Sequence, residues 1–529
     1  MHRNRRFGCQ LAIVILLAGH VLCPAAFARD LHVDPQAGDD TSPTGPFATI
    51  TRAIRMAQPG DTVHLKPITY RDYAGFYGIQ GEPGKPITLD GHGATLEGSD
   101  PLDPASWEEA EPGLFRCDDL MPRMNRAILQ RWFFLWDGEM QHMGRTSKGP
   151  SAPLKQPADL APGEWTFLEK AAEKEASGKP AASASAVLEG AFYLRLPPGQ
   201  KLEEANIFAP VRSAGVQFSG QGERHNAHLV IRNLTATHPH NDGFNIHGHC
   251  EDVLFENIRA IECGDDGISA HETAEYSVDG FVSIGNSTGI CDTGASQTTY
   301  NRVFIRDCLA FDLYFLDTGR YTVSNSVVLS SAVRPLYITG RDGTEEPCRV
   351  TLNNVLIRRI TGENEVRVSR NSVLHAGHVS LLGLNIQATG GEVHLHDSLI
   401  GPVPAASELP PTYDYIAAAT RKSMKTEAEQ KPDTFARGPL NPTVLLWRDV
   451  QWTADRNLYQ IQSLRFDKTT FTAARFDEFR QLTGQDAASR WTAANVPDSR
   501  AGAALKELQR LAVPTDDPVW RSFGPADRQ

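Results

Sequence analysis

Two short phrases, 24 residues apart, bring acids and histidines together in one part of the chain. Residues 241–247 are Asn-Asp-Gly-Phe-Asn-Ile-His, and residues 265–271 are Asp-Asp-Gly-Ile-Ser-Ala-His. Paired carboxyl groups suit the cleavage of a glycosidic bond: one, held protonated by its neighbour, donates to the leaving oxygen, and the other activates water or attacks. We expect Asp242 and Asp266 to be this pair, with Asp265 as the substitute for either.

Histidine is concentrated in the same region, where five of the chain's 17 histidines lie within 34 residues. An imidazole can act as a general acid or base, and stacked imidazoles beside an acid can also bind a divalent metal. Solvated surface histidines are the alternative. We favour catalysis or sugar binding over a metal site, and therefore expect His247 and His271 to be catalytic. The expected substrate contacts from this region are His238, His240, Asn245 and Glu272.

The repeated phrase continues as Asp292-Thr293-Gly294 and Asp317-Thr318-Gly319. If these copies stack, Asp292 and Asp317 extend an acidic ridge, and we expect both, with Arg320, to contact substrate. The alternative is that Asn, Asp and Gly only form stacked turns, which favour these residues. Like charges repel when stacked, however, and serve no turn that Asn would not serve equally well.

A second repeat predicts the scaffold. Alternating apolar residues followed by Asn or Asp recur from residue 229, at intervals of about 20 to 30 residues, which is typical of a β-solenoid. Residues one turn apart then become neighbours at about 4.8 Å. His271 should therefore lie beside His247, with Phe244, Ile246, Ile268 and Ala270 pointing inward. The repeat positions are Asn233, Asn257, Asn286, Asp307, Asn325, Asn354 and Asp397.

The opening segment, residues 31–67 (LHVDPQAGDDTSPTGPFATITRAIRMAQPGDTVHLKP), resembles that of secreted right-handed parallel β-helix proteins of the pectate-lyase-like superfamily. Residues 73–100 continue the pattern, and residues 455–489 are similar to the strand and helix that end many carbohydrate-active members. The resemblance implies an all-β, right-handed parallel β-helix with an N-terminal capping helix. It is specific for the fold and not for the reaction.

Within that superfamily, polygalacturonase-like hydrolases place an acid from an Asn-x-Asp motif one rung from an Asp-Asp pair. The phrases at 241–242 and 265–266 resemble a contracted version of that arrangement. The family's Gly-His-Gly and Arg-x-Lys motifs do not follow at the expected distance, and residues 287–289 (Ser-Thr-Gly) stand where the histidine would be. His247 and His271 are the candidates to take over its role.

Three functions therefore stay open, with a glycoside hydrolase favoured. A uronan lyase or epimerase would need a basic residue, often Arg or Lys in this fold, beside a uronate. A non-catalytic glycan-binding solenoid is the third. In each case the partner is a polysaccharide or oligosaccharide, and no cofactor is required. Binding of a divalent cation such as Ca²⁺ is an alternative role for the acids. The arginines that follow the acidic ridge are Arg302, Arg306, Arg320 and Arg334.

The start of the chain resembles an export signal: basic residues, an apolar run from Leu11 to Leu22, and Ala26-Phe27-Ala28 as a cleavage site. We expect a secreted or periplasmic protein, cut near Ala28, that is monomeric and free of the membrane. Removing three arginines with the signal changes the formal charge from −12 to −15, which argues against nucleic acid as a partner.

The chain divides by pattern into a signal peptide (1–28), an N-terminal cap with the first rungs (29–104), an inserted β-rich region (105–210), the main rungs (211–402), and a linker with a C-terminal tail (403–529). A Lys/Glu/Ala-rich loop at 169–186 and a terminal amphipathic helix around 503–513 are further expectations. The unevenly spaced cysteines fit no metal motif. Export would permit disulfides, but Cys263 and Cys308 lie at apolar positions of the repeat, so we expect buried free thiols. They are Cys117, Cys250, Cys263, Cys291, Cys308 and Cys348.

Overall fold

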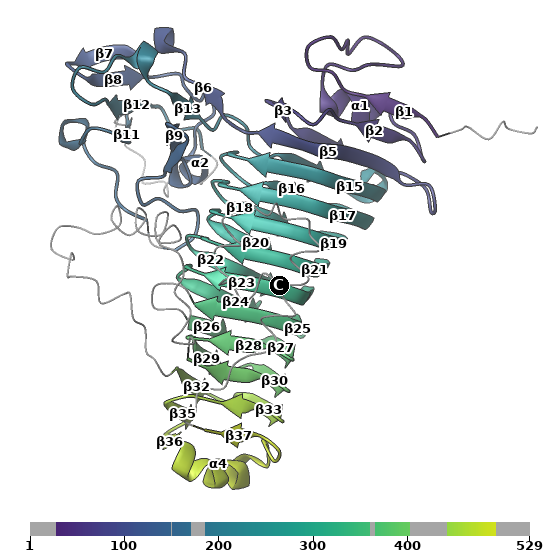
Figure 1. The fold of residues 1–529 in the computed structure, drawn as a ribbon, viewed down its shortest axis with the longest axis vertical. Helices are drawn as coiled ribbons and strands as arrows, with labels where there is room; N and C mark the ends of the chain where they lie inside the picture. Colours follow the sequence, from purple (N-terminus) through teal and green to yellow (C-terminus); the bar gives the residue numbers. More distant parts are fainter. Residues whose placement is uncertain (1–27, 150, 171–185, 360–364, 403–441, 493–529) are drawn as a thin grey trace, which may run out of the picture.

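The computed structural model describes residues 28–149, 151–170, 186–359, 365–402 and 442–492. These residues form a parallel β-solenoid, which confirms the predicted all-β architecture (Figure 1). Two parallel sheets run along the coil, and we call them the long-strand sheet and the short-strand sheet. The predicted signal peptide, most of the 169–186 loop, the linker up to residue 441 and the terminal helix lie outside the described residues.

Each turn of the coil contributes strands to both sheets. The long-strand sheet contains β1 (Asp30–His32), β2 (Thr62–His64), β3 (Thr69–Tyr70), β5 (Ile87–Glu97), β15 (Asn226–Thr237), β17 (His249–Ile261), β19 (Thr273–Ile284), β21 (Gln297–Arg306), β23 (Arg320–Ser330), β25 (Cys348–Arg359), β27 (Ser372–Gly377), β28 (Ser380–Leu382), β30 (Glu392–His396), β31 (Leu399–Gly401), β33 (Gln451–Asp455), β34 (Leu458–Tyr459) and β37 (Arg490–Trp491). The short-strand sheet contains β4 (Ala74–Tyr77), β14 (Val216–Ser219), β16 (Phe244–Ile246), β18 (Asp266–Ala270), β20 (Thr288–Asp292), β22 (Phe311–Asp317), β24 (Arg334–Gly340), β26 (Glu365–Val368), β29 (Asn385–Thr389), β32 (Thr443–Trp447), β35 (Ser463–Phe466) and, antiparallel to β35, β36 (Thr469–Phe471).

The core lies between the two sheets. In β16 and β18, Phe244 pairs with Ile268 and Ile246 with Ala270, and all four side chains are fully buried in the coil. This confirms the predicted phase of these strands. The six described cysteines are free and buried, as predicted.

A column of left-handed residues bends each long strand. Asn233, Asn257, Asn325 and Asn354 occupy this position with φ near 50°, and Asn325 and Asn354 take part in a ladder of amide hydrogen bonds across rungs. Asn286 and Asp307 do not share this position, because the strand register places Gly280 and Arg302 at the bend in their rungs. Both instead follow the end of a long strand, where Asp307 is left-handed as a turn residue should be. Glycine and asparagine adopt this conformation most readily, which explains the recurring Asn.

Two antiparallel sheets form the insert, which lies beside the N-terminal half of the coil (Figure 1). Its aromatic-rich core includes Trp132, Phe134 and Trp165, so these side chains serve the insert's own packing. One sheet contains β6 (Asp100–Pro101), β9 (Phe134–Trp136), β10 (Glu139–Gln141) and β13 (Ile207–Ala209), and the other β7 (Glu108–Glu111), β8 (Leu114–Cys117), β11 (Glu164–Glu169) and β12 (Gly190–Arg195).

Helices lie at both ends of the coil and cover apolar residues there. α1 (Ile50–Met56) is capped by Thr49, whose hydroxyl accepts a hydrogen bond from the amide of Arg52. α4 (Phe476–Thr483) buries Phe476 and Phe479 at the other end (Figure 1). None of the helices described has the length and apolar character needed to cross a membrane. The remaining helical segments are α2 (Arg126–Gln130), η1 (Pro104–Ser106), η2 (Pro157–Asp159), η3 (Leu202–Glu204), η4 (Gly222–Arg224) and η7 (Ala473–Arg475).

Candidate active site

Three aspartates meet at the start of two neighbouring short strands. Asp242 precedes β16, and Asp265 and Asp266 lie at the start of β18 one rung away. One carboxylate oxygen from each lies within 4.8 Å of the others, and all three side chains are buried. The sequence offset of 24 residues therefore becomes direct proximity, as predicted.

A column of glycines explains why the phrase recurs. A Cβ on Gly243 would lie 2.8 Å from the carbonyl oxygen of Gly267, and a Cβ on Gly267 would lie 2.7 Å from that of Gly289. Only glycine permits such close approach of successive rungs. The next copy of the phrase after Asp265-Asp266-Gly267 is therefore the segment that ends at Gly289, not the one that ends at Gly294.

This register corrects the predicted acidic ridge. Asp292 pairs with Ala270 and Phe315, so it points into the coil, where it bonds to buried hydroxyl groups including that of Tyr300. Asp317 lies at the far end of β22, where it pairs with Arg341. Both are separated from the aspartate cluster by the length of a short strand, because their Asp-Thr-Gly phrases follow the strands instead of preceding them.

The insert supplies the cations that contact the cluster. Lys148 Nζ lies 2.6 Å from Asp265 Oδ1 and 2.5 Å from Asp266 Oδ1, and Arg131 lies 3.2 Å from Asp265 Oδ2. Ser147 also donates a hydrogen bond to Asp265. Sequence reasoning missed these three residues, since they are more than 100 positions from their partners and belong to no repeat.

The charges separate the pKa values of the three carboxyl groups. Burial alone would raise the pKa of Asp265, but Lys148 and Arg131 outweigh it and lower the pKa to about 2. Burial and the charge of Asp265 raise the pKa of Asp242 to about 6 and that of Asp266 well above its usual range. Lys148 stays protonated: burial opposes its charge, but the nearby carboxylates hold its pKa well above the usual value. Pairs of carboxyls with divergent pKa values are a pattern of acid–base sites.

Hydrogen bonds hold Asp242 in place. Its Oδ1 accepts from the backbone amide of Asp266 at 3.1 Å, and its Oδ2 accepts from the hydroxyl of Ser269 at 2.6 Å.

Asn245, expected to contact substrate, is buried and donates to Gln217. The cluster is one of two groups whose atoms could hold a metal ion among the described residues. In this structure Lys148 supplies the positive charge between Asp265 and Asp266.

His247 and His271 stack as predicted, with ring centroids 4.0 Å apart and planes inclined by 6°. Burial and the neighbouring His247 ring lower the pKa of His271 to about 4, so it is neutral near pH 7. His247 lies 3.3 Å from Glu272, whose carboxylate also accepts from the amide of Gly248. The pair follows the ends of β16 and β18, so the length of a short strand separates it from the aspartates at the starts of these strands. The two rings could bind sugar hydroxyls there.

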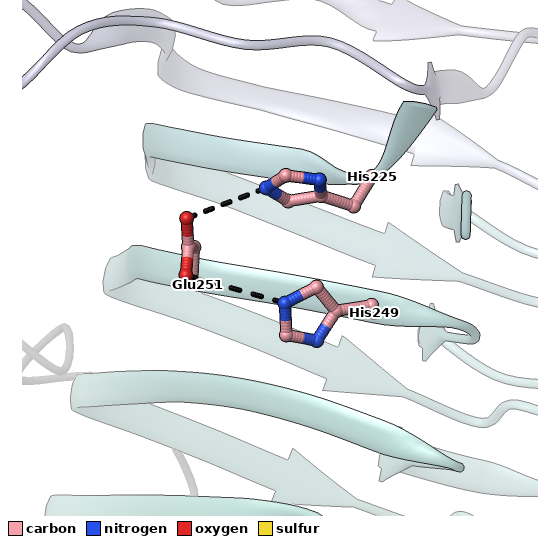
Figure 2. Close-up of side chains that lie close together, drawn as sticks. All are labelled: His225, His249 and Glu251. Atoms are coloured by element: carbon pink, nitrogen blue, oxygen red, sulfur yellow. Dashed lines mark hydrogen bonds and ion pairs between the residues drawn. The ribbon is translucent and has the colours of Figure 1, made fainter. Parts of the chain in front are cut away.

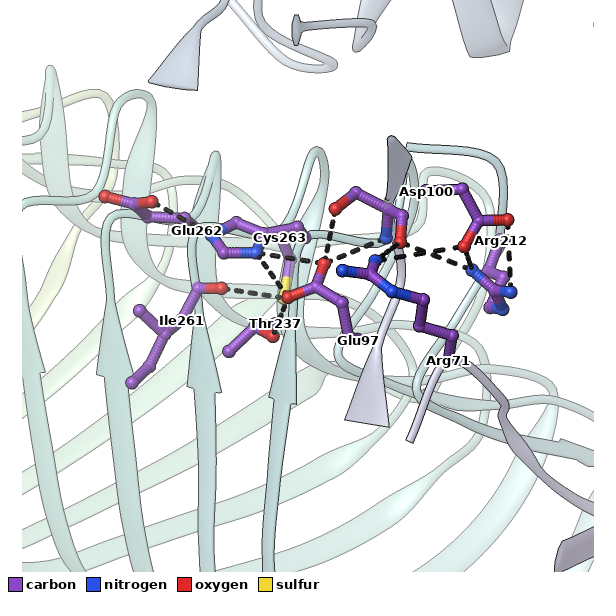
Figure 3. A network of polar contacts seen from close by, with 10 residues as sticks. Arg71, Glu97, Asp100, Arg212, Thr237, Ile261, Glu262 and Cys263 are labelled. Carbon is purple, nitrogen blue, oxygen red and sulfur yellow. Dashed lines mark hydrogen bonds and ion pairs between the residues drawn. The ribbon is translucent and has the colours of Figure 1, made fainter. Parts of the chain in front are cut away.

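The other two histidines expected to bind substrate have different surroundings. His238 lies between two carboxylates, 3.0 Å from Glu97 and 3.2 Å from Glu262. Figure 3 shows the position of Glu97 within this network, which also holds Thr237. His240 is buried against the ring of Trp132 in the insert, and burial lowers its pKa to about 3. The contact between His240 and Trp132 joins the coil to the insert, whereas the partners of His238 belong to the coil itself.

An aromatic strip continues from the cluster along the outward face of the short-strand sheet. In successive strands, Asp266 pairs with Thr288, Thr288 with Phe311, and Phe311 with Arg334. The Phe311 ring stacks on Tyr314 at 4.2 Å, and Tyr314 and Tyr337 are partly exposed. Arg334 and Arg367 lie over the Tyr337 ring at 5.4 and 6.0 Å.

The other arginines considered from sequence lie on the long-strand sheet. Arg302 pairs with Asp279, and Arg306 lies 3.4 Å from Asp307. Arg320 begins β23, pairs in register with Gln297 and Arg349, and is exposed. Of the four, Arg334 alone shares a sheet with the aspartate cluster.

No protein-family model matches the sequence, and no curated protein matches it. Solved structures that are similar include the following two. One, described as the complex of XylC with xylose, has 10% identity and a TM-score of 0.47, and the match covers 89% of this chain and 87% of that one. The other, described as a glycoside hydrolase, has 10% identity and a TM-score of 0.37, with 71% and 94% covered. At these values, neither likeness says what this chain acts on.

Proposed function

We propose that the protein is an exported carbohydrate-active enzyme that hydrolyses glycosidic bonds with the aspartate cluster. The observation that carries the proposal is the meeting of Asp242, Asp265 and Asp266 on adjacent rungs with divergent pKa values. A glycosidase needs one protonated and one ionised carboxyl group on either side of the bond that it breaks.

The pKa values suggest a role for each acid. Asp266, whose pKa is raised well above its usual range, is the proton donor to the leaving oxygen. Asp242, with a pKa of about 6, is ionised above that pH and acts as the base or nucleophile. Asp265 remains charged and anchors Lys148 and Arg131. The close approach of the carboxyls favours the retaining geometry of about 5 Å over the inverting one of about 6.5–9.5 Å.

Substrate would lie along the outward face of the short-strand sheet. Tyr314 and Tyr337 are partly exposed aromatic side chains that a sugar can contact. His247 and His271 offer hydrogen-bonding groups at the other end of β16 and β18 from the acids. Because Lys148 lies against Asp265 and Asp266, the proposal requires this side chain to withdraw when a sugar reaches Asp266.

A lyase or epimerase acting on uronans is the second candidate. Arg334 favours it, because this cation lies on the same face and in register with Asp266, at a position where it could face a uronate. Absorbance near 235 nm from an unsaturated product would identify elimination. A change in uronate stereochemistry without cleavage would identify epimerisation.

The test is a polysaccharide and oligosaccharide panel, assayed for reducing ends and for unsaturated product. Asp266→Asn and Asp242→Asn should each lower turnover by about 10²- to 10⁴-fold. Asp292→Asn is the matched control: this aspartate is equally buried, and burial raises its pKa to about 7, but it faces the core. Full turnover in both cluster variants would refute the assignment. Saturable glycan binding without any product would favour a binding protein.

A further inference from the structure

A second cluster of metal-ligating side chains lies on the long-strand side of the coil, outside the aspartate site. Figure 2 shows His225, His249 and Glu251 turned toward one another. The strand register pairs Ala227 with Glu251, so His225 lies one rung from His249. One ring nitrogen of each histidine and one carboxylate oxygen of Glu251 lie within 4.8 Å of one another. We propose that these three residues bind a divalent transition-metal ion, with zinc as the best fit.

Hydrogen bonds to the backbone fix the orientation of both imidazoles. Nδ1 of His225 lies 2.8 Å from the carbonyl oxygen of Gly222, and Nδ1 of His249 lies 3.1 Å from that of Thr273. A carbonyl only accepts, so each Nδ1 carries a proton and donates it. In a neutral ring the lone pair is then on Nε2, the atom that faces Glu251. Such a second bond, which sets the tautomer, is a regular feature of metal-binding histidines.

When both rings are neutral, the atoms that converge are therefore all acceptors. His225 Nε2 lies 3.3 Å from one oxygen of Glu251, and His249 Nε2 lies 4.0 Å from the other. With both imidazoles neutral, no proton lies between these nitrogens and the carboxylate, and their lone pairs face negative charge. A cation at the centre of the three residues would satisfy every one of these groups at once.

The spacing suits a small metal ion. Ligands bound at about 2.0–2.1 Å in tetrahedral geometry lie roughly 3.3 Å apart. The 3.3 Å between His225 and Glu251 already fits this spacing, and the 4.0 Å between His249 and Glu251 would have to close on binding. Two imidazoles and a single carboxylate favour zinc or a similar ion, whereas calcium prefers six to eight oxygen ligands. The side chains are 21%, 37% and 49% exposed for His225, His249 and Glu251, which leaves room for entry and for water as the remaining ligand.

The test is zinc binding to the full chain without a polyhistidine tag, measured by competition with a chromogenic chelator. We expect one zinc ion to depend on this site, with affinity lowered at least tenfold in His225→Ala, His249→Ala and Glu251→Gln. His228→Asn is the matched control, because His228 pairs with Asp252 across the same two strands, and Asn tolerates its left-handed backbone (φ 53°). This control should bind zinc as the wild type does.

Asp266→Asn distinguishes zinc binding at the aspartate cluster from zinc binding at His225, His249 and Glu251. If zinc bound at the aspartate cluster, this variant would lose it and the histidine variants would not, and the proposal would be overturned. It would also be overturned by a wild-type protein that does not compete with the chelator. In the wild type, zinc should raise the midpoint of thermal unfolding, and this shift should be absent from the conservative Glu251→Gln variant and present in His228→Asn.

Discussion

Lys148 offers the sharpest test of the electrostatics of the aspartate cluster. Lys148→Met keeps most of the length of the side chain and removes the ammonium group that bridges Asp265 and Asp266 at 2.6 and 2.5 Å. Arg131 then remains as the cation in contact with Asp265. The matched control is Lys155→Met, which removes an equally short pair with Glu164 from a more exposed part of the same insert.

The expected loss follows from the burial of the pair. The Asp265 and Asp266 side chains are 12% and 4% exposed, and removal of one partner from a buried ion pair costs about 3–5 kcal/mol in free energy of unfolding. Exposed pairs contribute about 0.2–1 kcal/mol, so the control should lose no more than that. We therefore expect a difference of about 3 kcal/mol between the two variants at pH 8.

The loss should depend on pH with a definite sign. In the wild type, the pKa of Asp265 is about 2, below its ordinary 3.8, so its ion pairs stabilise the fold above pH 3.8 and this contribution is lost toward pH 2. Without Lys148, burial raises the pKa of Asp265 in the folded state, and the ionised Asp265 carboxylate then lowers the free energy of unfolding at high pH. Protonation relieves that cost, so the deficit of Lys148→Met should be smaller at pH 5 than at pH 8.

Urea unfolding followed by tryptophan fluorescence measures this effect. The insert contains Trp107, Trp132, Trp136 and Trp165, half of the chain's eight tryptophans. A loss of 3 kcal/mol corresponds to a midpoint shift of about 1–3 M urea for a slope of about 1–3 kcal/mol per M. A shift no larger than that of Lys155→Met, or a deficit that grows toward pH 5, would refute the reasoning.

Three further variants test other parts of the molecule. His238→Asn should lower the free energy of unfolding, measured in urea, by about 2–3 kcal/mol between pH 4.5 and 6.5 and by nothing at pH 10. The bonds to Glu262 and Glu97 outweigh burial and raise the pKa of His238 to about 9, so the stabilisation is lost as the pH rises through that value. An unchanged deficit at pH 10 would contradict this. Gly243→Ala should lower the free energy of unfolding by about 1–3 kcal/mol and lower activity by displacing Asp242, since the new Cβ would lie 2.8 Å from a carbonyl oxygen of the next rung. A variant with the thermal stability of the wild type would contradict this expectation. Tyr337→Ala should raise KM about tenfold with kcat nearly unchanged if its ring binds sugar before and during reaction alike, whereas an effect on kcat alone would remove it from the binding face.

Much of the fold could be predicted because a solenoid turns sequence offset into spatial adjacency. The apolar alternation of Phe244 and Ile246 fixes which side chains enter the core, and the 24-residue interval places His271 on His247. The same logic failed where the strand phase changes. Asn286 has the motif of a bend residue but is buried, and accepts from the amide of Cys263. Identity of residue type alone does not specify position within a rung.

The sequence by itself determined the coil, the pairing of β16 with β18 and the meeting of Asp242, Asp265 and Asp266, since those depend on interactions between successive turns. Only the tertiary structure decided their charge state. Lys148 and Arg131 come from an insert with its own core, and a contact across more than 100 residues between two non-repeating segments leaves no local pattern. The tertiary structure also decided that Asp292 faces the core, because the column of glycines, and not the acid, sets which side chains of each short strand point inward.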